Sequence, residues 1–251
     1  MSDSTQSYSA KGEVSNITKR RTRFERIKIA FSKAPLSAWF GMIVLSIYLI
    51  AAFFAPFIAP HGEAEVFPVA YAPWGGEHLL GTDQIGRDIL SRLIFASRNT
   101  LGICFLACTI ALFIGTIFGI IAAIDRSYID QILSRSIDTL MAIPVMIFTF
   151  ILLSVFGPSN LNLILILGVL ESTRFFRISR SVAVGQVVLE YVEVAKLRGE
   201  KLSYIIFREI LPNIASPLIV EFGIRFIFII FTVSSLSFLG LGIQPPAADW
   251  A

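Results

Sequence analysis

Long apolar runs separated by short polar segments dominate the chain from residue 37 onward. An uncharged run of about 20 residues is long enough to cross a bilayer as a helix. Gly157-Pro158 interrupts a run too long for one helix, so we expect a hairpin of two spans there. The pattern therefore predicts an all-α, polytopic membrane protein. Five spans are expected, at residues 37–59, 100–124, 139–156, 161–176 and 212–240.

Composition agrees with a membrane protein and excludes an ordinary soluble domain. The 251 residues are 55% hydrophobic and only 16% charged, with a mean hydropathy of +0.74, whereas soluble domains are about one quarter charged. The two cysteines, Cys104 and Cys108, lie within one apolar run. We expect them to act as small apolar residues rather than as a disulfide or metal site.

The chain divides into four regions by composition. Residues 1–36 form a basic tail, residues 37–60 the first span, residues 61–99 a long polar loop, and residues 100–251 a helical core. A basic tail beside a membrane span favours a role in orientation over nucleic-acid binding. No nucleic-acid partner is therefore expected.

The distribution of Lys and Arg predicts the orientation in the membrane. Of 21 such residues, 17 lie in the tail, in residues 125–138 or in residues 174–210, and three lie on the opposite side. Because cytoplasmic segments are enriched in Lys and Arg, the N-terminus and residues 174–210 should be cytoplasmic. An odd number of spans then leaves the end at residue 251 outside.

Within the core, a polar segment at residues 185–212 interrupts the apolar chain. Residues 190–198 have helical periodicity, Gly199 breaks the pattern, and Pro212 suits the first turn of the next helix. Glycine readily adopts the backbone angles that end one helix before another begins. The segment is predicted to form a helix–Gly–helix knob on the membrane face, rigidly joined to the last span.

The loop before the second span contains the compact polar motif Leu80-Gly-Thr-Asp-Gln-Ile-Gly-Arg-Asp88. We expect Thr82 or Asp83 to cap a helix and Asp88 to pair with Arg92, four residues later. This motif is interpreted as mainly structural, with an outer gate or a docking face for a binding protein as the alternative.

Two features of the spans have packing or charge significance. Small residues recur every four positions in the second span and predict a buried helix–helix seam; they are Ala107, Ala111, Gly115, Gly119 and Ala123. Glu221 and Arg225 lie inside the last span, where charged groups are costly and are expected to pair or to line a wet cavity. Glu171 is expected to pair with Arg174.

Three stretches resemble those of a known family. Glu193-Val194-Ala195, followed by Gly199 and by Leu211-Pro212, resembles the EAA signature of bacterial ABC-importer permeases, with Val194 at a position usually occupied by Ala. Residues 80–88 and 236–246 resemble two further stretches of the "C"-type subunit of dipeptide, oligopeptide and nickel importers. That family normally has six spans, so the chain is interpreted as C-terminally shortened.

This resemblance implies an ABC type I importer permease fold in the bacterial inner (plasma) membrane. It implies a homologous permease subunit, two ABC ATPase subunits, an external solute-binding protein and membrane lipid as partners, with peptides or related small solutes as cargo. The expected ATPase-coupling residues are Glu193, Val194, Ala195, Gly199, Leu211 and Pro212. The expected outer signature comprises Gly81, Thr82, Asp83, Gly86, Arg87 and Asp88.

No enzymatic chemistry is expected of this chain. The sequence lacks a GxxxxGK[ST] phosphate-binding loop, so partner subunits would hydrolyse the ATP. No catalytic residue, metal site or cofactor is predicted. Two alternatives remain: an ATP-independent secondary transporter that uses Glu221 and Arg225, and a membrane scaffold that recruits a soluble protein. ATP-dependent uptake in reconstituted vesicles would separate these from an ABC permease.

Overall fold

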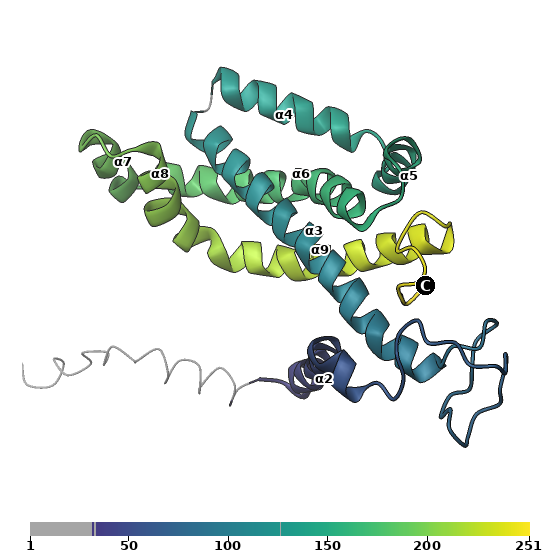
Figure 1. The fold of residues 1–251 in the computed structure, drawn as a ribbon. Helices are drawn as coiled ribbons and strands as arrows, with labels where there is room; N and C mark the ends of the chain where they lie inside the picture. The colour runs from purple at the N-terminus through teal and green to yellow at the C-terminus, as the bar shows by residue number, and fades with distance from the viewer. Residues whose placement is uncertain (1–31, 33, 126) are drawn as a thin grey trace, which may run out of the picture. The chain divides into compact units, whose positions relative to one another are not determined.

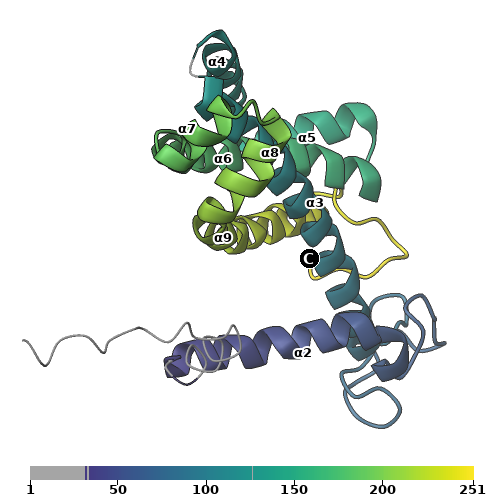
Figure 2. The same ribbon diagram turned by 90° about the vertical axis from the view of Figure 1, so that its left-hand side faces the viewer.

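The computed structural model describes residue 32 and residues 34–125 and 127–251, whose regular secondary structure is helical (Figures 1 and 2). Most of the predicted basic tail lies outside the described residues. The chain divides between residues 47 and 48 into two structural units. Helix α2 (Leu36–Ile58) crosses that division, is apolar enough to span a membrane, and kinks at Phe54, two residues before Pro56.

By length and composition, three helical stretches of the described chain can cross a membrane. They are α2, α3 (Ile89–Asp125) and a continuous stretch from Leu202 to Phe238. A fourth crossing exists if α4 (Tyr128–Met141) and α5 (Val145–Phe156), which meet at 85°, form one broken span. The fold class is therefore the predicted all-α membrane architecture, but these three or four stretches are fewer than the five spans expected from the sequence.

The predicted third span is wrong at its beginning. Thr139 lies inside α4, and the chain bends before Pro144 to start α5. Proline disfavours a helical conformation at the preceding residue, so α4 cannot run straight on into α5. The polar residues 125–138, which lie between two predicted spans, mostly form α4, an amphipathic helix tied to α6 (Asn160–Val187) by Arg180 Nη2, 2.6 Å from Asp130 Oδ2.

Helix α6 (Asn160–Val187) is longer and more polar than predicted for a span ending near residue 176. Its first half is apolar, whereas its second half carries Arg174, Arg177 and Arg180. At 28 residues the helix is about 42 Å long, which exceeds the hydrocarbon thickness by about two turns. The sequence pattern therefore located the apolar part of this helix and missed its polar continuation.

The predicted seam of small residues is confirmed. Ala107, Ala111, Gly115, Gly119 and Ala123 are all buried. A Cβ at Gly115 or Gly119 would collide with the backbone of α6, and the Ser179 hydroxyl lies within hydrogen-bond distance, 3.2 Å, of the Gly115 carbonyl. Small side chains thus allow α3 and α6 to pack backbone to backbone, which is how helices gain contact energy in lipid.

Two apolar clusters hold the core of residues 48–251 together. One surrounds Cys104 and Cys108, which are both fully buried beside Leu163 and Leu167. The other gathers the end of α3, the end of α6 and the residue 190–210 segment around Ile120 and Ala183. The cysteines are therefore packed as apolar residues.

The loop between α2 and α3 and the C-terminal segment meet at the beginning of α3. The Ala248 backbone N–H donates to Glu63 Oε1 at 2.6 Å, and the Asn99 side chain donates to the Ala248 carbonyl at 2.9 Å. Trp250 donates to the Leu93 carbonyl at 3.3 Å. The segment around α7 (Glu190–Leu197) lies at the opposite end of α3 (Figure 1).

Candidate functional site

The predicted knob contains a short helix, α7, with one face packed against α3 and α6 and the opposite face exposed. In α7, Val192 and Ala195 are fully buried against Ile120 and Ala183. Ala195 was expected to contact a partner; its burial instead makes it a packing residue that holds α7 on the body of the molecule. Its small side chain permits this close approach.

The opposite face of α7 is exposed and partly apolar. Leu197 is 81% exposed and Val194 is 50% exposed, and the Glu193 carboxylate lies beside them in solvent. Glu193 occupies the first turn, where a carboxylate interacts favourably with the helix dipole, and no side chain caps the beginning of α7. We call Glu193, Val194 and Leu197 the exposed α7 face.

Gly199 ends α7 in the way that was predicted. Its φ is +73°, in the left-handed region. The Glu200 N–H donates to the Ala195 carbonyl at 3.2 Å and the Gly199 N–H to the Lys196 carbonyl at 3.0 Å, which together form a Schellman motif. A Cβ at this position would meet no atom within 4 Å, so the requirement for glycine comes from the backbone angle alone.

After Gly199 the chain leads without a break into the last span. Helix α8 (Leu202–Tyr204), the π-helical turn η1 (Ile205–Ile210) and α9 (Leu211–Phe238) form one continuous helical stretch. Pro212 lies exposed in the first turn of α9, and Leu211 is half-buried beside it. A displacement of the knob would therefore act directly on α9.

A hydrogen-bond bridge that sequence reasoning missed joins α7 to both neighbouring helices. The Tyr191 hydroxyl donates to Gln186 Oε1 at 2.8 Å and accepts from Asn213 Nδ2 at 3.3 Å. Burial and the negative charge of Glu209 raise the pKa of Tyr191, so its hydroxyl remains protonated near neutral pH. The side chain thus connects the end of α6, the knob and the start of α9.

Hydrogen bonds and close backbone contacts within the loop hold the residue 80–88 motif in place. The Thr82 hydroxyl donates to the Val69 carbonyl and accepts from the Ala72 N–H, both at 2.8 Å. Gly81 and Gly86 have positive φ and pass so close to backbone carbonyls that a Cβ would collide. These contacts fold residues 67–88 into a compact loop.

Two predicted interactions in this motif are wrong. Neither Thr82 nor Asp83 caps a helix; Asp88 caps α3, accepting from the Ser91 N–H at 2.8 Å. Asp88 also does not pair with Arg92, whose Nε lies 3.8 Å from Asp83 Oδ2. Asp83 instead binds both Arg92 and Arg87, whose Nε is 2.8 Å away.

Both aspartates of the motif are held in the charged form. Burial opposes ionisation of Asp83, but hydrogen bonds from Arg87 and Ile85 outweigh it and lower the pKa of this carboxyl below its usual value. Burial likewise opposes ionisation of Asp88, while hydrogen bonds from Ser91 and His78 lower its pKa. Each aspartate is therefore a fixed negative charge in the loop.

The intramembrane charges form a group of three rather than a pair. Arg225 Nε lies 2.7 Å from Glu221 Oε1, and Arg225 Nη1 lies 3.8 Å from Glu171 Oε2. Glu171, expected to pair with Arg174, is therefore nearest to Arg225 of another helix. Glu171 and Arg225 of this group line a cavity of about 380 Å³ between α6, α9 and the bend that joins α4 to α5.

Comparison with known proteins shows the class of this protein. Residues 115–251 match the family described as binding-protein-dependent transport system inner membrane component, and residues 31–73 match the N-terminal transmembrane domain of oligopeptide transport permease C. The chain belongs to this family of multi-pass inner-membrane permeases. It is a C-type permease subunit of an ABC importer, a class that contains no ATPase active site and that works with separate ATPase and binding-protein partners.

Several similar proteins are named as peptide or glutathione permeases. The dipeptide transport system permease protein DppC of Alkalihalophilus pseudofirmus is 34% identical over 212 residues, which cover 84% of this chain and 69% of the relative. DppC of Escherichia coli is 34% identical over 88% of this chain and 76% of its own length. The glutathione transport system permease protein GsiD of Pectobacterium atrosepticum is 31% identical over 92% and 77%.

Proposed function

We propose that this permease subunit moves peptides or similar small solutes inward, and that ATPase motion reaches its spans through residues 190–212. The observation that carries the coupling proposal is the two-sided character of α7. One face is fixed to α3 and α6 by buried Val192 and Ala195, and the other exposes Leu197 and Val194 to a partner. An exposed apolar patch beside a carboxylate is typical of a protein interaction surface.

The proposed route of force has two steps. An ATPase subunit would bind the exposed α7 face from the cytoplasm and displace the knob. Because the Gly199 turn is short and Tyr191 ties α7 to Asn213, α9 would follow. Mechanical coupling of this kind requires a helix that can occupy two discrete positions. We propose α9 as that helix, because it begins with a π-helical turn, a feature that is frequent at functional sites.

The remaining partners follow from the same proposal. A homologous permease subunit would complete the translocation path, and two ATPase subunits would dock on the two knobs. An external solute-binding protein would dock at the outer signature, which lies with the C-terminal segment at the other end of α3. Peptide cargo is proposed because relatives are named as dipeptide and glutathione permeases. The N-terminus would be cytoplasmic, and lipid would cover the apolar helix faces.

Reconstitution tests the proposal. The chain is placed in proteoliposomes with its partner permease, ATPase subunits and binding protein, and uptake of a labelled dipeptide is measured. We expect uptake that requires both ATP and the binding protein and that persists when ion gradients are dissipated. Uptake driven by an ion gradient without ATP would favour a secondary transporter, and ATPase recruitment without any uptake would favour a scaffold.

A further inference from the structure

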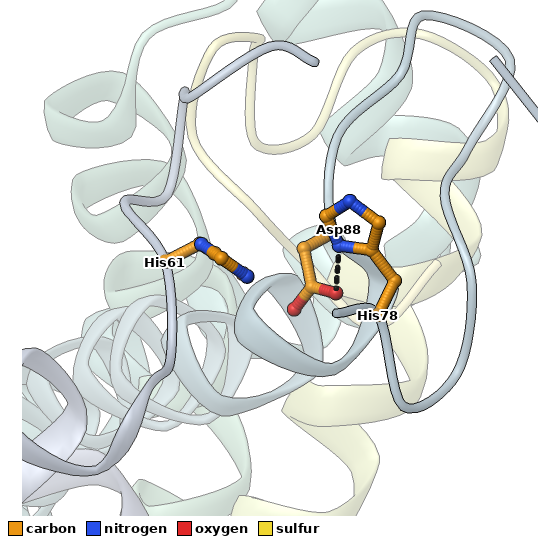
Figure 3. A group of neighbouring side chains, drawn as sticks. All are labelled: His61, His78 and Asp88. Carbon is orange, nitrogen blue, oxygen red and sulfur yellow. Dashed lines mark hydrogen bonds and ion pairs between the residues drawn. The ribbon is translucent and has the colours of Figure 1, made fainter. Parts of the chain in front are cut away.

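Both histidines of the chain lie in the outer loop and meet at the beginning of α3. His61 follows α2 and His78 lies 17 residues later, yet the folded loop brings both against Asp88 (Figure 3). One nitrogen from each histidine and one carboxylate oxygen of Asp88 all lie within 4.8 Å of one another. The spacing of these residues predicts no metal site, because they approach one another only through the folding of the loop.

The distances suit a shared metal ion. His78 Nδ1 lies 3.1 Å from Asp88 Oδ1, and two ligands bound to one ion at about 2.1 Å are separated by about 3.0 to 3.4 Å. All three ligand atoms lie within 4.8 Å of one another, so the widest pair is at most about 1.4 Å beyond the upper end of this range. Rotation of the imidazole rings about their side-chain bonds would bring the ligand atoms onto one ion.

The ligands are also held in place by the surrounding loop. Ser91 binds the other Asp88 oxygen, Oδ2, through its N–H at 2.8 Å and its hydroxyl at 2.7 Å, which leaves Oδ1 directed at His78. The same Ser91 hydroxyl accepts from the His61 backbone N–H at 3.0 Å. Phe67 packs edge-on against both imidazoles, with ring centroids 4.8 and 4.6 Å away. Such outer contacts orient metal ligands in known sites.

We propose that His61, His78 and Asp88 bind a divalent transition-metal ion of the zinc class on the outer side of the membrane. Two imidazoles and one carboxylate favour Zn²⁺, Co²⁺ or a similar ion over Mg²⁺ or Ca²⁺, which prefer oxygen ligands alone. The bound ion would join the chain that leaves α2 to the cap of α3. Asp88 caps α3 through Oδ2, and that role requires neither histidine beside its carboxylate.

Titration of the full chain in lipid nanodiscs tests this site. The chain, carrying a purification tag without histidine, is titrated with Zn²⁺ by calorimetry. We expect one Zn²⁺ per chain, and a loss of affinity on the order of tenfold or more in His61→Gln or His78→Gln. Glu65→Gln is the matched control, because it neutralises an exposed carboxylate in the same loop while its amide oxygen can still accept the Gly62 N–H.

Cobalt identifies the ligands directly. Because the chain has only two histidines, imidazole ligation in the Co²⁺ absorption spectrum must come from this cluster, and thiolate bands would mark Cys104 or Cys108 instead. Zn²⁺ binding that is absent, that is equal in the wild type and the His61→Gln/His78→Gln double variant, or that gives Co²⁺–thiolate bands would overturn the proposal. Circular dichroism of each variant separates loss of the metal from loss of the fold.

Discussion

Replacing Gly199 by valine is expected to lower ATP-driven uptake strongly while the chain still inserts in the membrane. The Schellman motif needs φ near +73° at this position, and a β-branched residue is strongly disfavoured there, at a cost of at least about 1–2 kcal/mol. The knob would relieve this strain by changing the angle between α7 and α8. Uptake in proteoliposomes should fall on the order of tenfold, because about 1.4 kcal/mol corresponds to a factor of ten.

Gly199→Asn is the matched control. Asparagine adopts the left-handed conformation more readily than other non-glycine residues, and a Cβ here meets no neighbouring atom. The asparagine variant should therefore keep most of the uptake. Equal uptake by the valine and asparagine variants would show that the turn geometry has no part in coupling.

Replacing Arg225 by leucine is expected to have the largest effect on folding. The substitution leaves Glu171 and Glu221 without their nearest cation inside a membrane-spanning helix bundle. Removing one partner of a buried charge group costs about 3–5 kcal/mol. The folded, monodisperse protein recovered in mild detergent should fall sharply, as measured by size-exclusion chromatography.

Two further variants assign that loss to the charge group. Arg208→Leu removes an exposed arginine of the same continuous helix and should leave folding unchanged. The triple change Glu171→Gln, Glu221→Gln and Arg225→Leu removes all three charges and should recover most of the lost protein, since neutral replacement of a buried ion group is often tolerated. Failure of the triple variant to recover would indicate that Arg225 acts through packing.

Features that depend on local sequence could be predicted well. The small-residue stripe of α3 follows from helical spacing alone, and Gly199 follows from the preference of glycine for left-handed backbone. The hydrophobic runs located the apolar parts of α2, α3 and α9. Each of these signals involves residues that are close in the sequence.

Features that depend on residues distant in sequence could not be predicted. Arg92 has Asp88 at helical spacing but pairs with Asp83, because the loop folds back over the beginning of α3. Tyr191 of α7 connects Gln186 at the end of α6 to Asn213 at the start of α9. No local sequence pattern indicates that bridge. The direction of a chain after a break, as between α4 and α5, is likewise set by packing.

The position of the ATPase contact tests the account most directly. A photo-crosslinking amino acid is placed either at Leu197, on the exposed α7 face, or at Trp74, which is 85% exposed in the outer loop. The complex is irradiated in native membranes and the crosslinked partners are identified by mass spectrometry. Coupling through α7 predicts an ATPase adduct at position 197 and none at position 74. An ATPase adduct at position 74, or only lipid adducts at position 197, would contradict it.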